Sequence, residues 1–105
     1  MDFTDRVLFL TSQIPPGRVT TYKEIARSLG NVGLSRAVGN SLKKNPNPVR
    51  IPCHRVIRSN GDVGGFSRGV AEKIRLLKKE GILIEDNKVK DFEGIIFKAE
   101  EMKNP

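Results

Sequence analysis

The chain has 105 residues with one cysteine, one histidine and a formal net charge of +7, enough for one domain with a modest core but not for an internal disulfide or a structural zinc site. No apolar run approaches the ~20 residues of a membrane span, and the first residues lack the layout of a signal peptide. We therefore expect one soluble domain over residues 1–105, in the cytoplasm and thus in a reducing compartment, without metal or cofactor.

The first predicted helix follows Asp2, a residue type that caps helices, and ends at the "PPG" of residues 15–17. Its apolar residues recur at helical spacing: Phe3, Val7, Leu10 and Ile14. A second helix is predicted in "TYKEIARSLG", where Thr21 and Glu24 form the pattern of a capping box.

A third helix is predicted in "LSRAVGNSLKKN", with Leu34, Val38 and Leu42 on one apolar stripe. Together with the second helix and the turn between them it forms a plausible helix-turn-helix. Small and basic residues lie away from the stripe, a pattern that suits a helix laid against DNA, although a solvated face would look similar. Ser35 lies on the same face, and the predicted DNA-binding residues are Arg36, Ala37, Gly39, Asn40, Ser41 and Lys43.

The charge distribution supports an acidic partner for this half of the chain. Residues 1–58 carry ten basic and three acidic residues, whereas residues 59–105 carry nine of each. The whole excess of +7 therefore lies in the first half, and nucleic acid is the commonest partner of such a surface. A basic surface that serves only solubility remains the alternative.

Prolines in "NPNPVRIP" exclude a regular helix, so we expect a stiff extended segment that delivers Cys53. "CHRVIRSNGDVGGF" then predicts a strand, an Asn-Gly turn and a return strand. A longer helix is predicted over about 69–80, with Val70, Ile74 and Leu77 facing inward, and a hairpin turning at Asp86-Asn87. Residues 98–105 are expected to form a frayed tail.

Cys53 and His54 are adjacent, and arginines surround them. A lone intracellular cysteine is more often a small buried residue than a nucleophile. Three local features nevertheless favour a nucleophilic role for Cys53. Prolines stiffen the preceding segment, a histidine is adjacent, and the nearby arginines favour the thiolate form. A nucleophilic cysteine needs a base, for which His54 is the only histidine, and an acid that orients it, for which Glu80 at a helix end is a candidate.

The stretches "RAVGNSLKKNPNPV", "IPCHRVI", "GDVGGFSRG" and "LLKKEGI" closely resemble the C-terminal domain of the O6-alkylguanine-DNA alkyltransferases. The resemblance runs from about Phe3 to Ile84 and implies a mainly α, winged helix-turn-helix-like fold with a small β-hairpin. The family's N-terminal domain has no counterpart in this sequence, which leaves open a protein partner in its place. We expect a monomer that binds double-stranded DNA carrying O6-alkylguanine.

The resemblance also implies roles for single residues. Cys53 matches the alkyl acceptor, His54 the residue that deprotonates it through a water, and Glu80 the acid that holds the histidine. Asn45 matches the asparagine that fixes the turn before the active site, and Tyr22 the tyrosine that helps to rotate the nucleotide and protonates the departing guanine.

Two further matches concern DNA and substrate. Arg36 matches the arginine finger that fills the space left by the flipped base. The glycine-rich loop is expected to line the substrate pocket, through Val63, Gly64, Phe66, Ser67 and Arg68. Family members often have glycine or a bulkier apolar residue where this chain has Arg68, which leaves the width of the pocket open.

The implied function is single-turnover DNA repair, in which the alkyl group passes from guanine to Cys53. One alternative is a non-catalytic alkyltransferase-like protein that binds the lesion and recruits another pathway. Such proteins have lost the cysteine, and this chain retains it. An alternative of another class is a helix-turn-helix transcription factor with a structural Cys53. A thiol hydrolase would leave the basic half without a purpose.

Overall fold

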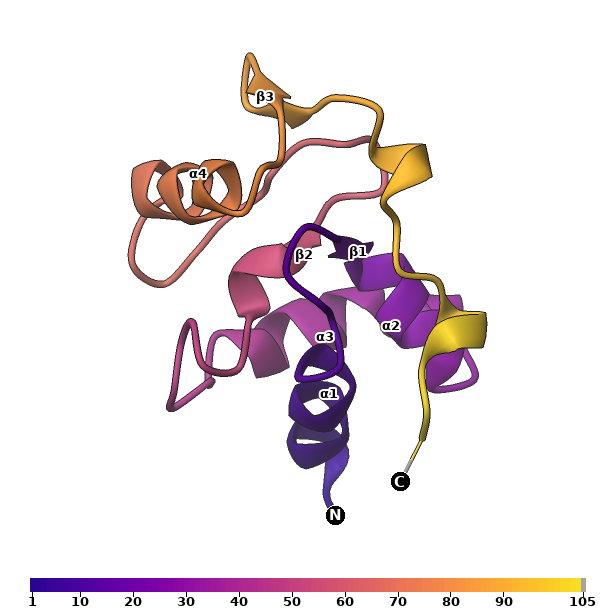
Figure 1. Cartoon of the computed structure of the whole chain (residues 1–105). Coiled ribbons are helices and arrows are strands. Elements are labelled where there is room, and N and C mark those ends of the chain that lie inside the picture. Colours follow the sequence, from indigo (N-terminus) through magenta and orange to yellow (C-terminus); the bar gives the residue numbers. More distant parts are fainter. Residues whose placement is uncertain (105) are drawn as a thin grey trace.

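The computed structural model describes residues 1–104, which fold mainly into helices with two small sheets (Figure 1). The α-helices are α1 (Phe3–Thr11), α2 (Tyr22–Ser28), α3 (Ser35–Leu42) and α4 (Val70–Lys79). The strands are β1 (Thr20–Thr21), β2 (Val56–Ile57), β3 (Ile84–Glu85) and β4 (Lys88–Val89). Short 3-10 turns span Val32–Leu34, Cys53–Arg55, Phe92–Gly94 and Ala99–Glu101. In this part of the chain no helix combines the length and apolar character needed to cross a membrane.

The caps of the first two helices form largely as predicted. Asp2 accepts a hydrogen bond from the backbone N–H of Asp5 at 2.8 Å, and Asp5 bonds back to the Asp2 N–H. Thr21 caps α2 through the N–H of Glu24, at 3.0 Å. The Glu24 carboxylate does not complete a capping box; it instead accepts the N–H of Ala99, at 2.8 Å.

Helices α1, α2 and α3 pack against one another around one core. Fully buried residues of this core come from all three helices and include Val7, Leu10, Ile25, Ala26 and Val38. The same cluster includes Cys53, which is 7% exposed. Helices α2 and α3, with the short turn before α3, form the predicted helix-turn-helix. The two helices pack together because each carries an apolar stripe at helical spacing.

The prediction of a strand, turn and return after Cys53 was only partly right: a short strand forms, and the Arg58 N–H donates to the Asp62 carbonyl across the Asn-Gly turn at 2.9 Å, but no return strand pairs with β2 in the described residues. Cys53–Arg55 form a 3-10 turn, and only Val56–Ile57 are extended. This strand pairs in parallel with β1, with Thr20 opposite Val56, rather than with a strand beyond the Asn-Gly turn. The parallel partner lies more than thirty residues earlier in the sequence, so no local pattern could reveal it.

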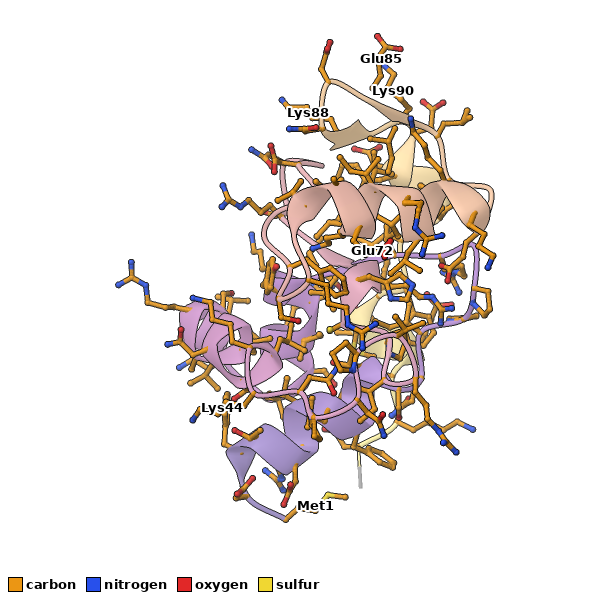
Figure 2. All side chains as sticks on the ribbon, turned by 90° about the vertical axis from the view of Figure 1, so that its left-hand side faces the viewer. Met1, Lys44, Glu72, Glu85, Lys88 and Lys90 are labelled. Carbon is orange, nitrogen blue, oxygen red and sulfur yellow. The ribbon has the colours of Figure 1, made fainter. Side chains whose placement is uncertain are left out.

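The hairpin predicted at Asp86-Asn87 is present, with β3 and β4 antiparallel. Both turn residues have positive φ, 52° and 61°, as a tight two-residue hairpin turn requires. Figure 2 shows its charged side chains, labelled at Glu85, Lys88 and Lys90, at the end of the molecule opposite Met1.

Helix α4 confirms the predicted element, and two of its predicted inward residues, Ile74 and Leu77, pack inward, whereas Val70 does not. Val70 is 39% exposed, whereas Lys73 is fully buried together with Leu77. The inward stripe thus begins at a lysine, a residue type that sequence patterns place on the surface. This helix covers a second core of residues from both halves of the chain: Val19, Ile57, Val63, Leu77, Ile82 and Val89.

Residues 98–104 pack against the first helices and do not form the frayed tail predicted from the sequence. Met102 is 7% exposed within the first core, and Gln13 and Lys103 exchange two hydrogen bonds. Arg18 forms a bidentate pair with Glu101, at 2.8 and 2.9 Å. In Figure 1 this last segment runs beside α2 and ends near the N-terminus. Residue 105 lies outside the described residues.

Candidate active site and nucleic-acid interface

Cys53 begins the 3-10 turn that lies between α3 and α4 in Figure 1. Its N–H donates to the carbonyl of Ile51 at 2.7 Å. Asn45 fixes the loop before it: its Nδ2 donates to the Ile51 carbonyl at 2.9 Å, and its Oδ1 accepts the N–H of Asn47 at 2.8 Å. The cysteine therefore sits on a short coiled turn held by an asparagine, not on the extended segment predicted from its prolines.

The structure brings together His54 and Glu80, which lie 26 residues apart. Nε2 of His54 lies 3.0 Å from a Glu80 carboxylate oxygen, and His54 is fully buried. Glu80 is the C-terminal cap of α4, where Gly81 with a φ of +87° ends the helix. Arg55 binds the same carboxylate through two nitrogens, at 2.9 and 2.7 Å, and donates to the carbonyl of Ile14.

The protonation states follow from this network. Burial raises the pKa of Glu80, but its hydrogen bonds from Arg55 and His54 outweigh this and leave it below the ordinary value. Burial lowers the pKa of His54, and the opposing pull of Glu80 does not offset it. A neutral His54 beside an ionised Glu80 donates its Nε2–H, so Nδ1 carries the lone pair.

Nδ1 of His54 is buried and has no hydrogen-bond partner among the described residues. A buried acceptor without a partner is costly, and such atoms are found where chemistry uses them. The chain thus presents a neutral, oriented imidazole whose basic nitrogen is uncommitted, on the residue next to a cysteine. This arrangement can accept a thiol proton.

Lys73 was not predicted as part of the site, yet it is hydrogen-bonded to the glycine-rich loop of the site. Its Nζ donates to the carbonyls of Val56, at 2.7 Å, and Gly65, at 3.0 Å, and so joins β2 to the glycine-rich loop. Burial is the main cause that lowers the pKa of Lys73 to about 8, although a Cys53 thiolate opposes the shift. Lysines with such perturbed pKa values concentrate at functional sites.

The buried ammonium predicts an unusual pH dependence of stability. The native lysine releases its proton near pH 8 and the unfolded one near 10.5, so the unfolded state binds more protons between these values. The free energy of unfolding should therefore rise with pH in this window, by up to about 3 kcal/mol relative to Lys73→Met. Urea denaturation of both proteins below and above the window measures it; a constant difference between them would contradict the assignment.

A groove of about 1000 Å³ opens over Cys53 between α2, α3 and the loops that follow β2. Its lining includes predicted site residues that lie between residues 22 and 67: Tyr22, Arg36, Gly39, Asn40, Lys43, Cys53, Phe66 and Ser67. Four basic side chains line it and no acidic one does, the basic ones being Lys23, Arg36, Lys43 and Arg58. Such a groove suits a polyanion that presents a group to the cysteine.

Four predicted site residues lie elsewhere. Ser41 is buried, and its hydroxyl shares a hydrogen bond with Thr4, at 3.0 Å, so it joins α3 to α1. Ala37 is half-buried and does not line the groove. Val63 belongs to the second core, and the exposed Arg68 points no atom to the groove lining. Sequence spacing alone does not determine which face of a helix or loop points to the groove. The predicted site therefore also contained neighbours of the residues that line it.

Tyr22, the first residue of α2, is held between two glycines. A Cβ at Gly39 would lie 3.8 Å from its ring, and one at Gly64 would lie 3.2 Å from its hydroxyl. Gly64 has a φ of +73°, which few other residues adopt. Gly64 therefore lies at the site, as predicted, although it packs on Tyr22 and does not line the groove itself.

Replacing Gly39 with alanine should separate stability from DNA binding. The added methyl makes an ordinary contact with Tyr22, and alanine favours a helix by about 1 kcal/mol over glycine, so Gly39→Ala should raise the free energy of unfolding. The same methyl stands on the groove wall, so affinity for duplex DNA should fall. Denaturation and DNA titration of one preparation measure both; a rise in affinity would contradict this placement.

Sequence reasoning missed the clamp of Arg55 on Glu80, the buried Lys73 and the groove side chains of Lys23 and Arg58. From the sequence, the arginines near Cys53 predict only a positive electrostatic environment for its thiolate, not specific contacts. The position of Lys73 on the apolar stripe of α4, four residues before Leu77, was the one signal that could have found it.

Comparisons with known proteins agree with this arrangement. The family described as "6-O-methylguanine DNA methyltransferase, DNA binding domain" matches residues 2–82. A methylated-DNA–protein-cysteine methyltransferase of Saccharolobus islandicus is 55% identical over 74 residues, which are 70% of this chain and 47% of the relative. The chain thus spans about half the length of that curated relative.

Two solved structures resemble the fold. Mycobacterium tuberculosis OGT in complex with DNA has a TM-score of 0.74 at 40% identity, covering 77% of this chain and 49% of that one. S. pombe Atl1, bound to damaged DNA containing O6-carboxymethylguanine, has a TM-score of 0.80 at 31% identity and covers 91% and 94%. The predicted helix-turn-helix-like fold is confirmed, and the chain belongs to the family of 6-O-methylguanine DNA methyltransferase DNA-binding domains.

Proposed function

We propose that the chain repairs DNA by transferring an alkyl group from O6 of guanine to Cys53. The observation that carries this proposal is the uncommitted Nδ1 of a buried, neutral His54, oriented by Glu80, beside a cysteine on the floor of a basic groove. His54 takes the thiol proton through a water. The resulting thiolate attacks the alkyl carbon, and the bond between that carbon and O6 breaks.

The electron pair of the broken bond stays with guanine, which then takes a proton. Tyr22 is the donor on the groove wall, since its hydroxyl packs against the loop that carries Phe66 and Ser67. The product is a thioether on Cys53 and unmodified guanine. A thioether to a plain alkyl group has no easy hydrolytic exit, so each chain reacts once and needs no cofactor.

Access to the base requires that the nucleotide leave the duplex, which costs a few kcal/mol. Helix α3 presents the exposed Arg36 and Asn40 along the groove, and Arg36 fills the space that the base vacates. Lys23 and Lys43 lie beside the same groove, where they contact phosphates. We place the protein at DNA in the cytoplasm or nucleoid, where its thiol stays reduced.

A second candidate function is binding of O6-alkylguanine lesions without repair. The likeness to S. pombe Atl1, which is nearly as long as this chain, favours it. Retention of Cys53 next to an oriented His54 favours transfer.

Counting methyl groups decides between the two. Duplex DNA with labelled O6-methylguanine is incubated with excess protein, and then with substoichiometric protein. Transfer predicts that label on the protein stops at one methyl per chain and that each transfer restores one guanine. Label that stays on tightly bound DNA would instead establish a lesion-binding protein.

A further inference from the structure

Arg58 has no role in the transfer described so far, yet its side chain lines the groove above Cys53. It directly follows β2, and its exposed side chain lines the groove with Tyr22 and Cys53. A Cβ on Gly64 would lie 3.2 Å from the Tyr22 hydroxyl, 3.5 Å from Cγ of Arg58 and 3.7 Å from its Nε. The Tyr22 phenol and the Arg58 side chain therefore both lie against Gly64, where an added side chain would crowd the phenol.

We propose that Arg58 is a positioning residue for Tyr22, whose guanidinium stabilises the phenolate that forms when the phenol protonates the departing guanine. This inference rests on the proposed transfer reaction. The step balances: the O–H bond of Tyr22 breaks, its proton passes to the guanine anion, and the negative charge moves to the phenolate oxygen beside Arg58. Solvent later returns a proton to Tyr22.

The charges around Tyr22 favour proton transfer from its phenol once Cys53 has been alkylated. Burial raises the pKa of the phenol, Arg58 lowers it and a Cys53 thiolate raises it. Alkylation turns the thiolate into a neutral thioether just as guanine needs its proton, so the opposing charge disappears while Arg58 remains. The other charged groups that line the groove are all basic: Lys23 from α2, Arg36 from α3 and Lys43, which directly follows α3. No acid on these elements lines the groove to cancel the guanidinium.

A direct titration can test this coupling, because Tyr22 is the only tyrosine and the chain has no tryptophan. Ultraviolet absorbance of the phenolate therefore reports Tyr22 alone. Arg58→Met should raise the midpoint by about 1 pH unit, as expected when a nearby opposite charge is removed. Arg58→Lys should restore most of the shift, and Arg68→Met, an equal charge change on an exposed residue off the groove, should leave the midpoint in place. Circular dichroism limits the comparison to the pH range in which the fold persists.

Reaction kinetics give a second, independent test. Rates with free O6-benzylguanine, which carries no phosphate, are measured for wild type, Arg58→Met, Tyr22→Phe and the double variant. Coupling predicts that Arg58→Met slows the reaction several-fold when Tyr22 is present and little when phenylalanine replaces it. A loss confined to duplex DNA and independent of Tyr22 would overturn the proposal and make Arg58 a phosphate contact.

The two measurements also separate this inference from the proposed function. A wild type that transfers alkyl groups while the midpoint stays unmoved in Arg58→Met overturns this inference alone. A wild type that transfers nothing to Cys53 overturns the proposed function and, with it, the role of Arg58.

Discussion

Replacing Cys53 with alanine should abolish methyl transfer and leave affinity for O6-methylguanine DNA within a few-fold of wild type. The sulfur is the only atom of this residue that reacts, and it lies at the floor of a groove whose basic and polar walls come from other elements. Binding energy therefore comes from those walls. The side chain is small and only 7% exposed within the first core, so alanine removes little packing.

The comparison is sharpest when transfer and binding are measured on one protein preparation. Glu80→Gln serves as the graded control: it weakens the hold on His54 but removes no reacting atom, so transfer should slow rather than vanish. The acid limb of its pH–rate profile should move to lower pH, because the Glu80 carboxylate raises the pKa of His54 and the glutamine amide does not. Wild-type transfer rates in Cys53→Ser would contradict the assignment of the acceptor.

Replacing Arg36 with alanine should slow repair of duplex DNA roughly a hundredfold and leave reaction with free O6-benzylguanine nearly unchanged. Keeping a base out of the stack costs a few kcal/mol, and each 1.4 kcal/mol is tenfold, so losing the side chain that fills the gap has a large effect on duplex DNA alone. Arg36 is exposed on α3 and lines the groove, so alanine should not disturb the core.

Lys44→Ala is the matched control for Arg36→Ala. Lys44 is an exposed basic residue just beyond α3 that does not line the groove, and it is labelled in Figure 2. It should weaken duplex binding modestly through the salt-dependent phosphate term. Equal losses with Arg36→Ala on duplex and free base would make Arg36 a pocket or folding residue.

Local patterns were enough to predict the helices and the hairpin. Asp2 with its capped helix, and the left-handed pair Asp86-Asn87 in its hairpin, depend on residues within a few positions of each other. Such interactions are written in the sequence itself, through capping chemistry and turn conformation.

Long-range geometry could not be predicted in the same way. The parallel pairing of Thr20 with Val56 and the packing of Met102 into the first core depend on how distant segments meet. Lys73 shows the limit most clearly: its burial is possible only because two carbonyls, those of Val56 and Gly65, face its ammonium group. No sequence window of α4 contains those carbonyls.

The candidate site divides along the same line. Its residues follow from the resemblance and from the adjacent Cys53 and His54, whereas the clamp of Arg55 and the approach of Arg58 to Tyr22 follow from the fold. Both arginines come from the same short segment as the cysteine. They differ in their contacts because the fold directs Arg55 to Glu80 at the end of α4 and leaves Arg58 at the groove.

Intact-mass analysis after incubation with O6-methylguanine duplex DNA tests the central claim most directly. The account predicts that the mass of the chain rises by one methyl group in place of a proton, and that peptide mapping places it on Cys53. An unchanged mass in protein that still binds the lesion, or a methyl group on any other residue, would contradict it.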